Sequence, residues 1–344
     1  MKKNVIIPLI MVAVFAVCGA IFWFSYFGHG GSHTRTAADQ AAAPRHVTVK
    51  LKWLHQAQFA GMYTAKEKGF YAQAGLDVDL QPFSYQSPTI DAVANGKADF
   101  GVTGADELLL ARAKGLPLKA IAVIYKINPI CAYSLKEKNI TKPQDFIGKT
   151  VGLEKGVDIE NLYDVMMSRV GVDRAKIKEV AIGYDATELL AGKTDVSTGY
   201  VINEPQMAIE NGKQVNIILM ADYGADMYAD VVVTRDDLIK NDPELVEKFL
   251  RATLNGWQYA IENEGEAVSY TLKYATDRTR AHETYMLKNS IPLINTGDTP
   301  IGYMETAKWQ GVRDILVSQK LLAPDFDVSQ AYTTAFIDKI RAQP

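Results

Sequence analysis

Two hydrophobic patterns alternate along the chain from residue 46 onward. Short apolar runs rich in β-branched residues, HVTVKLKW at 46–53 and LDVDLQPF at 76–83, are typical of strands. The segment 61–74 between them has the spacing of a helix and ends before a glycine. Strands that alternate with helices in this order predict βαβ units and a largely parallel sheet.

The alternation continues beyond this first unit. Ser87 is a candidate N-cap, with Pro88 in the first turn of a helix that Gly96 closes, and DFGVT then predicts a strand. The helix ADELLLARAK ends at Gly115, and LKAIAVIY predicts the next strand. These elements extend the same sheet.

A second series of elements starts after Pro129. The predicted strands are 131–136, 149–154, 177–182, 195–202 and 215–220, and the predicted helices are 158–171, 186–192 and 204–212. The strand 228–235 is expected to return to the first lobe, and a long amphipathic helix follows at 243–263.

We therefore predict an α/β protein with two lobes. Lobe 1 consists of residues 47–130 and 228–344, and lobe 2 consists of residues 131–227. Two crossings between the lobes, near 130 and near 226, predict a hinge and a ligand cleft.

The N-terminus predicts export. Lys2 and Lys3 precede an uncharged apolar run at 5–27, which is longer than a usual signal-peptide core and long enough to span a bilayer. We therefore favour residues 1–27 as an uncleaved anchor over a cleaved signal peptide. A lipoprotein site at Cys18 is disfavoured, because bulky Val17 precedes it. The small, polar segment 28–46 is expected to be a flexible tether, which places the folded part in the periplasm, either tethered to the inner membrane or released after cleavage.

The composition excludes several classes of protein. The chain has 344 residues and a formal charge of −3, which disfavours nucleic-acid binding. Its two cysteines, Cys18 and Cys131, give no disulfide framework and no CxxC motif. No HExxH, GxSxG or P-loop motif occurs, and no acid–base pair of carboxylates stands out. We expect no enzyme activity, no cofactor and no metal.

The candidate ligand-binding residues follow predicted strands, where open α/β sheets place their ligands. In the loop WLHQAQFAG, Trp53 and Phe59 offer flat surfaces, His55, Gln56 and Gln58 offer polar groups, and Gly61 permits close approach of the backbone. We favour Trp53 as a ligand contact over a core residue at the strand end, whereas Tyr63 could equally be packing. The other candidates are Gly104 and Asp106 at a helix start, Glu154 after a strand, Tyr200, Asn203 and Glu204 at the mouth of the second lobe, and Tyr228 and Asp230 at the second crossing.

Some of these residues have an alternative structural role. Asp106 or Glu107 could accept a hydrogen bond from the ligand, but Asp106 could instead cap its helix. Glu204 could likewise serve as a cap or a hinge residue. The loops hold aromatic residues and carboxylates but few arginines or lysines, whereas a sulfonate, nitrate or phosphate prefers cationic side chains or several free amides. A flat heterocycle with amino groups would stack on Trp53 and donate to carboxylates such as Glu154 or Glu204. We therefore predict a small nitrogen heterocycle as the ligand.

Four stretches, KWLHQAQFAGMYTAKEKGFYAQAGLDVDL, GKADFGVTGADELLLARAKGLPLKAIAVIY, DFIGKTVGLEKG and TGYVINEPQ, resemble the substrate-binding proteins of ABC importers in the thiamine-pyrimidine-precursor family. This family is similar to the sulfonate- and nitrate-binding proteins and to the yeast-type pyrimidine synthase. The resemblance covers most of residues 47–320. It implies a type II periplasmic-binding-protein fold that closes on its ligand by a hinge motion, and it places the family's ring-holding aromatics on Trp53 and nearby tyrosines.

The resemblance implies capture of a thiamine pyrimidine precursor, or a related heterocycle, and delivery to an inner-membrane ABC permease. We expect a monomer. The enzymatic relatives use a cysteine-rich iron-binding run and a lysine-bound pyridoxal phosphate, and this chain lacks such a run. Two alternatives stay open: a ligand-sensing module for a membrane kinase or receptor, and a pyrimidine-processing enzyme.

Overall fold

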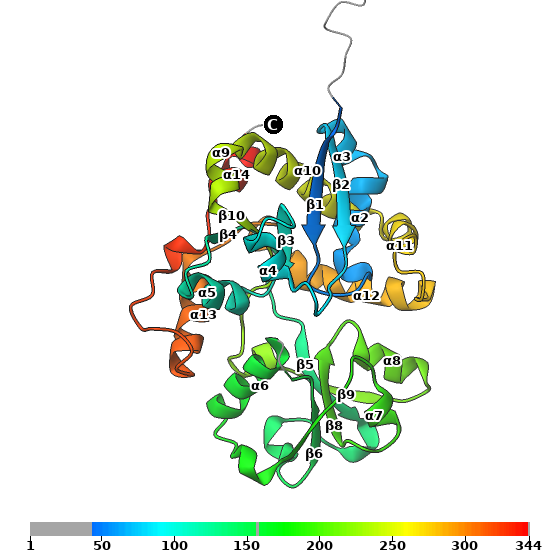
Figure 1. Cartoon of the computed structure of the whole chain (residues 1–344). Coiled ribbons are helices and arrows are strands. Elements are labelled where there is room, and N and C mark those ends of the chain that lie inside the picture. Colours follow the sequence, from blue (N-terminus) through cyan, green and yellow to red (C-terminus); the bar gives the residue numbers. More distant parts are fainter. Residues whose placement is uncertain (1–42, 156–157, 343–344) are drawn as a thin grey trace, which may run out of the picture. The chain divides into compact units, whose positions relative to one another are not determined.

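The structure is a computed structural model that describes residues 43–155 and 158–342. Residues 44–342 belong to one compact unit, and within it the described residues form two five-stranded sheets (Figure 1). The predicted anchor at 5–27 and most of the tether lie outside the described residues. Among the residues that the structure describes, no helix is long and apolar enough to cross a membrane.

The first sheet, which defines lobe 1, has the strand order β2-β1-β3-β10-β4. Its strands are β1 (Arg45–Lys50), β2 (Leu76–Gln81), β3 (Phe100–Thr103), β4 (Leu118–Tyr125) and β10 (Ala229–Arg235). β1 pairs in parallel with β2 and β3, and β10 runs antiparallel to both β3 and β4.

The second sheet, which defines lobe 2, has the strand order β7-β6-β8-β5-β9. Its strands are β5 (Ile130–Leu135), β6 (Thr150–Leu153), β7 (Lys178–Ala181), β8 (Val196–Tyr200) and β9 (Val215–Leu219). β6 is parallel to β7 and β8, whereas β5 is antiparallel to β8 and β9. The largely parallel arrangement is confirmed with one exception in each sheet: a single strand, β10 or β5, runs antiparallel to the other four. The antiparallel strand is in each case the one by which the chain enters from the other lobe, β5 or β10.

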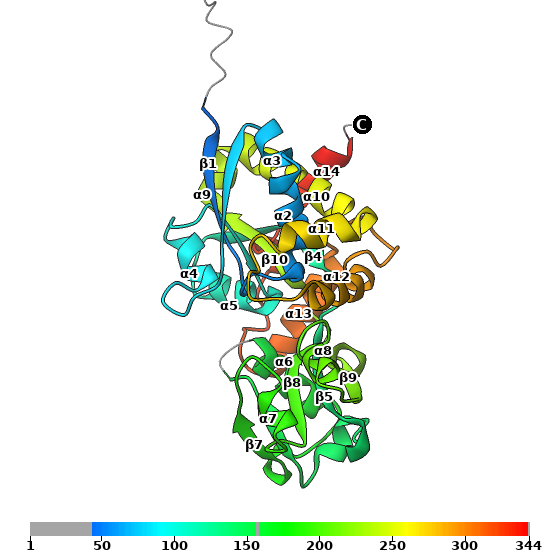
Figure 2. The same cartoon turned by 90° about the vertical axis from the view of Figure 1, so that its right-hand side faces the viewer.

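Helices cover both sheets, and the long C-terminal ones pack on lobe 1 (Figure 2). Lobe 1 carries α2 (Ala60–Glu67), α3 (Phe70–Gln73), α4 (Thr89–Ala94), α5 (Ala105–Ala113), α9 (Asp236–Asn241), α10 (Pro243–Glu262), α11 (Glu264–Thr271), α12 (Arg280–Ile294), α13 (Thr306–Ser318) and α14 (Ala335–Ala342). Lobe 2 carries α6 (Asp158–Arg169), α7 (Thr187–Leu190) and α8 (Glu204–Glu210). Short 3₁₀ turns lie at η1 (Ala57–Phe59), η2 (Lys136–Lys138), η3 (Pro143–Phe146), η4 (Arg174–Lys176), η5 (Met220–Tyr223) and η6 (Val328–Gln330).

Two of the predicted helices near the cavity differ from the observed ones. The helix expected over 61–74 is divided into α2 and α3 by Gly69, whose φ of +75° an L-residue rarely adopts. Pro88 is the N-cap of α4 rather than a residue of its first turn, so Ser87 lies outside the helix.

Gly61 serves helix packing and not close approach to a ligand. A Cβ atom added at Gly61 would lie 2.2 Å from the ring of Trp257 in α10, and one added at Gly256 would lie 2.2 Å from the Gly61 carbonyl oxygen. The backbones of α2 and α10 therefore touch at these two glycines. This contact fixes the start of α2, and with it the loop that follows β1.

Candidate functional site

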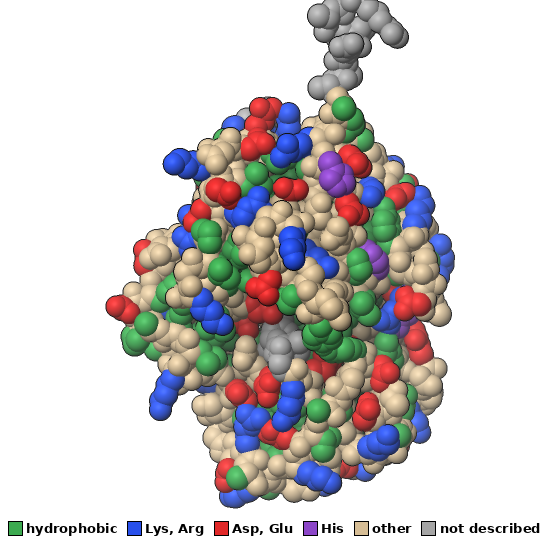
Figure 3. Space-filling model, in the orientation of Figure 1, with side chains coloured by type: hydrophobic (Ala, Val, Ile, Leu, Met, Phe, Trp, Pro, Cys, Tyr) green, Lys and Arg blue, Asp and Glu red, His purple; other side chains and the backbone are tan. Residues whose placement is uncertain are grey.

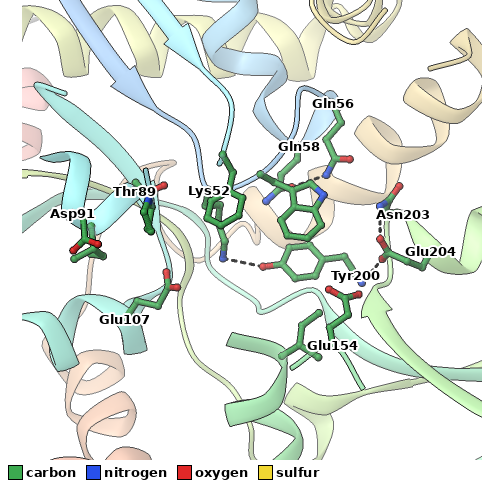
Figure 4. A pocket seen from close by; sticks show the side chains of 15 residues that line it. Lys52, Gln56, Gln58, Thr89, Asp91, Glu107, Glu154, Tyr200, Asn203 and Glu204 are labelled. Atoms are coloured by element: carbon green, nitrogen blue, oxygen red, sulfur yellow. Dashed lines mark hydrogen bonds between the residues drawn. The ribbon is translucent and has the colours of Figure 1, made fainter. Parts of the chain in front are cut away.

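A cavity of about 160 Å³ lies between the two lobes (Figure 4). Both lobes line it: Lys52, Trp53, Gln56, Gln58, Phe83, Pro88, Thr89, Ile90, Asp91 and Glu107 come from lobe 1, and Glu154, Ile159, Tyr200, Asn203 and Glu204 come from lobe 2. On the face shown in Figure 3, acidic side chains lie above and below the boundary between the lobes.

The cavity lies where strands of both sheets end. Residues 52–58 follow β1, 83–91 follow β2, and Glu107 follows β3, while Glu154 follows β6 and Tyr200 ends β8. The carboxyl ends of parallel strands in open α/β sheets are the usual place for a ligand. The topology therefore brings together five loops that are distant in the sequence.

Trp53 lies in the loop beyond β1, because the strand ends at Lys50 and is shorter than predicted. The backbone N–H of Phe83 donates to the Trp53 carbonyl at 3.0 Å, which ties the loops after β1 and β2 together. The ring of Trp53 lies nearly parallel to that of Phe83, with centroids 6.3 Å apart, and meets Tyr184 of lobe 2 edge-on at 4.7 Å. Trp53 thus lines the cavity and also contacts the opposite lobe.

A chain of three buried polar side chains sets the orientation of the glutamines behind Trp53. The Gln58 amide nitrogen donates to both carboxylate oxygens of Asp230 at 3.0 Å, and the Gln58 oxygen accepts from the Gln56 amide nitrogen at 2.7 Å. An ionised carboxylate only accepts hydrogen bonds, so Asp230 fixes which way each amide faces. The Gln56 oxygen is left buried without a hydrogen-bond partner among the described residues.

Hydrogen bonds from two neighbouring residues hold the Glu204 carboxylate in lobe 2. It accepts from the backbone N–H of Tyr200 at 2.7 Å and from the side-chain amide of Asn203. A Cβ atom at Gly199 would lie 2.6 Å from a Glu204 oxygen, so a glycine is needed there. Burial raises the pKa of Glu204 to about 7, although hydrogen bonds and the charge of Arg278 oppose this shift.

Two polar contacts join the lobes beside the cavity. The Lys52 ammonium donates to the Tyr200 hydroxyl at 2.9 Å. The imidazole of His282, on α12, meets the Asn203 side-chain oxygen at 2.9 Å and a Glu210 carboxylate oxygen at 3.3 Å. The His282 side chain is buried, and burial lowers its pKa.

Glu283, the next residue of α12, accepts a hydrogen bond from the Ala57 N–H at 2.5 Å, and burial raises the pKa of Glu283 to about 7.

The structure brings six of the predicted site residues to the cavity: Trp53, Gln58, Glu154, Tyr200, Asn203 and Glu204. It places the other seven elsewhere: His55, Phe59, Tyr63, Gly104, Asp106, Tyr228 and Asp230. In the loop after β1, the η1 turn directs the glutamines inward, while His55 is turned toward Tyr63, whose hydroxyl lies 3.0 Å from the ring. Tyr63 stacks on Tyr274 at 4.6 Å, and Phe59 is in the core of lobe 1.

The residues at the start of α5 and at the second crossing have structural partners. Gly104, not Asp106, is the N-cap of α5, and the Glu107 carboxylate accepts from the Gly104 N–H at 3.1 Å. Buried Asp106 accepts from Asn161 of lobe 2 at 3.2 Å. Tyr228 packs edge-on against Trp309, and Asp230 has the role described above of orienting Gln58. Asp230 has a φ of +49°, a left-handed conformation in which Asp is enriched.

The predicted site lacked several residues that line the cavity. Phe83 follows β2 in a segment that was predicted as the end of the strand 76–83, and Asp91 lies in the first turn of α4. Lys52 immediately precedes Trp53, and its position among aromatic and polar residues gave no indication that it would face the other lobe. His282 lies beside the cavity rather than in its lining, and the C-terminal helices that carry it gave no ligand-site signal.

Comparison with known proteins gives a consistent picture. A profile of the family described as "NMT1/THI5 like" matches residues 56–267. The riboflavin-binding protein RibY of Chloroflexus aurantiacus is 28% identical over 88% of this chain and 92% of its own length. The formylaminopyrimidine-binding protein of Halalkalibacterium halodurans is 26% identical over 81% of this chain and 86% of its own. The 4-amino-5-hydroxymethyl-2-methylpyrimidine phosphate synthase of Legionella pneumophila is 27% identical over 85% of this chain and 92% of its own.

The fold is likewise shared with solved structures. The periplasmic aliphatic sulphonate binding protein SsuA from Escherichia coli superposes with a TM-score of 0.66 at 15% identity, over 83% of this chain and 91% of that one. The predicted α/β fold of periplasmic binding proteins is therefore confirmed. Because the family profile covers more than half of the chain, the protein belongs to the NMT1/THI5-like family.

Proposed function

We propose that this chain is the solute-binding protein of an ABC importer and that it captures a single-ring nitrogen heterocycle, a pyrimidine of the thiamine-precursor type. The observation that carries the proposal is the cavity between the lobes, which Trp53 and carboxylates from both lobes line. Two relatives are named as binding proteins, and one of them is named for a pyrimidine.

The size of the cavity favours one ring over several. Its volume is about 160 Å³, and a cavity of about 150 Å³ in another protein takes up benzene. A six-membered ring with small substituents fits such a space, whereas the three fused rings of a flavin require a wider one. The size of the cavity therefore favours the kind of ligand for which the formylaminopyrimidine-binding relative is named, and not riboflavin.

The polar groups of the cavity favour an amino-substituted ring. Four of the lining residues are acidic and one, Lys52, is basic. A sulfonate or phosphate is held by cationic forks and free amides, and it would meet repulsion from these carboxylates. An aromatic ring with amino groups can stack on Trp53 and donate to Glu154 and Glu204.

Binding without chemistry is the simpler function for this arrangement. The synthase relative shows that a pyrimidine enzyme exists among similar chains. The iron and lysine chemistry expected of such enzymes needs a cysteine-rich run, and here the two cysteines are Cys18 and Cys131, the latter buried in β5. We propose that the cavity holds its ligand unchanged and passes it to a permease in the inner membrane.

Closure would involve the two segments between the sheets. Residues 126–129 and 220–228 join lobe 1 to lobe 2, and we propose that they bend as a hinge while the lobes, 47–130 with 228–344 and 131–227, move as bodies. The protein would work in the periplasm as a monomer, tethered by residues 5–27.

Native mass spectrometry of the full chain, purified in mild detergent from its own host, tests this function. We expect a co-purified molecule with the mass of a single-ring nitrogen heterocycle, released when the protein is unfolded. A bound flavin, sulfonate or inorganic anion would contradict the proposal. Turnover of a pyrimidine precursor by the purified protein with pyridoxal phosphate and iron would favour the enzyme instead.

A further inference from the structure

The charges that face the cavity are strongly unequal. Asp91 and Glu107 approach from lobe 1, and Glu154 and Glu204 approach from lobe 2, against the single ammonium of Lys52. Lys52 can neutralise one carboxylate, so a surplus of negative charge remains whichever partner it takes. Figure 4 shows the Glu154 and Glu204 side chains on the lobe 2 side of the cavity, opposite Gln56 and Gln58.

The hydrogen-bond donors of the three lining amides and of Thr89 are directed at the protein. The Gln56 amide nitrogen donates to Gln58, the Gln58 nitrogen donates to Asp230, and the Asn203 nitrogen donates to Glu204. Thr89 donates its hydroxyl hydrogen to the Leu51 carbonyl at 2.9 Å. The Gln56 oxygen, in contrast, is buried and has no partner among the described residues. The cavity is therefore richer in acceptors than in donors.

In the closure that the proposed function includes, the carboxylates of the two lobes would face each other across the cavity. Like charges from opposite lobes repel one another, and the repulsion grows as water leaves the site and the effective dielectric constant falls. A cation between them converts this repulsion into attraction, and a neutral molecule of the same shape does not. The charge of the ligand would then help to decide whether the lobes close.

We propose that the ligand is a cation, an aminopyrimidine that carries a protonated amine as a ring substituent, and that this protein discriminates against neutral hydroxyl and N-formyl counterparts. This inference rests on the proposed function and narrows its ligand class. It also separates this chain from the relative named for formylaminopyrimidine, because N-formylation removes the positive charge of an amine.

The test uses two ligands of nearly equal shape. One is 4-amino-5-hydroxymethyl-2-methylpyrimidine, which is neutral, and the other is its aminomethyl analogue, which is an ammonium ion at pH 7. Isothermal titration of both into the full chain in mild detergent should show at least tenfold tighter binding of the ammonium, because hydrogen bonds to charged groups are stronger than those between neutral groups. Equal affinities, or tighter binding of the hydroxymethyl or N-formyl compound, would overturn the inference and leave the proposed function standing.

Charge-removing variants sharpen the test. Glu107→Gln retains an oxygen that can accept from the Gly104 N–H, so it is expected to fold, and Glu154→Gln removes a second cavity charge. Each should lower the ratio of the two affinities at least threefold. Glu137→Gln, which removes an exposed charge in η2, is the matched control and should leave the ratio unchanged. An unchanged affinity ratio in both cavity variants contradicts the inference. Failure of the wild-type protein to bind either pyrimidine overturns both the inference and the proposed function.

Discussion

Two of the regions that join the lobes around the cavity are chemically opposite. We call the first the aromatic bridge: Trp53, Phe83 and Tyr85 of lobe 1 with Tyr184 of lobe 2. Tyr85 and Tyr184 are 60% and 37% exposed. We call the second the polar bridge: His282 of lobe 1 with Asn203 and Glu210 of lobe 2. His282 and Asn203 are 3% and 1% exposed.

The difference separates two tasks. Aromatic contacts tolerate sliding and tilting, so the aromatic bridge can loosen and re-form with little loss while a ligand enters. The polar bridge requires one geometry, and a closure that stops short of it leaves buried polar groups without partners, which costs about 1–3 kcal/mol for each. The aromatic bridge is therefore suited to admitting the ligand, and the polar bridge to stabilising the fully closed state.

Trp53→Ala should have the largest effect, because Trp53 belongs to the aromatic bridge and also lines the cavity. Loss of stacking and buried area should weaken pyrimidine binding by about 1–3 kcal/mol, or roughly 5- to 150-fold. Isothermal titration measures the change. Trp53→Phe keeps a ring at this position and should retain much of the affinity. An unchanged affinity in Trp53→Ala would remove Trp53 from the binding site.

The position of Trp53 shows what the sequence could predict. A tryptophan, glutamines and carboxylates that directly follow predicted strands were expected at the cleft, and Trp53, Gln58, Glu154 and Glu204 do line it. These four residues lie together because strand ends meet at one sheet edge in this fold. His55 lies against Tyr63 instead, because the direction of each side chain within a loop depends on local turn geometry, here the η1 turn.

The polar bridge was beyond prediction for a different reason. His282 and Asn203 are 79 residues apart and lie in opposite lobes, and Gln58 and Asp230 are 172 residues apart. Such contacts depend on how the lobes and helices pack in three dimensions. The hydrophobic periodicity of one segment does not indicate which distant segment it will contact. The mixed sheets have the same cause, since strand direction in β5 and β10 follows from where the chain crosses.

A pH series should have the second-largest effect, through Glu204 next to the polar bridge. Its pKa is raised to about 7 by burial, so the carboxyl is mostly protonated and neutral at pH 6 and ionised at pH 8. An ammonium ligand should therefore bind more tightly as the pH rises between these values, by at most tenfold per pH unit for one linked proton. Titrations at several pH values measure this.

The matched comparison for this pH series is the hydroxymethyl compound, whose affinity should stay nearly flat. Glu204→Gln should abolish the rise for the ammonium ligand. Arg278 and Glu210 also act on this region, since Arg278 opposes the raised pKa of Glu204 and Glu210 contacts His282. A rise of equal size in Glu204→Gln would assign the titration to another group.

His282→Ala breaks the polar bridge at a residue that does not itself line the cavity. It leaves the buried Asn203 oxygen and the Glu210 carboxylate without this partner. We expect a loss of about 1 kcal/mol in the free energy of closure, seen as roughly fivefold weaker ligand binding. Lys288→Ala, an exposed change on the same helix, is the control and should bind as the wild type does. Equal affinities in the two variants would show that the polar bridge does not support closure.

Tyr184→Ala should have the smallest effect, and it is the sharpest test of the division between the two bridges. Tyr184 meets Trp53 edge-on at 4.7 Å and Tyr85 at 6.3 Å, but its exposure limits the loss to about 0.5 kcal/mol, or about twofold in affinity. If the aromatic bridge covers the entrance, this loss should appear as faster dissociation, which stopped-flow tryptophan fluorescence can follow. Tyr184→Phe keeps the ring and should release ligand at the wild-type rate. Slower ligand association in Tyr184→Ala with an unchanged dissociation rate would mean instead that this tyrosine guides the ligand inward. In that case the aromatic bridge would not retain the bound ligand.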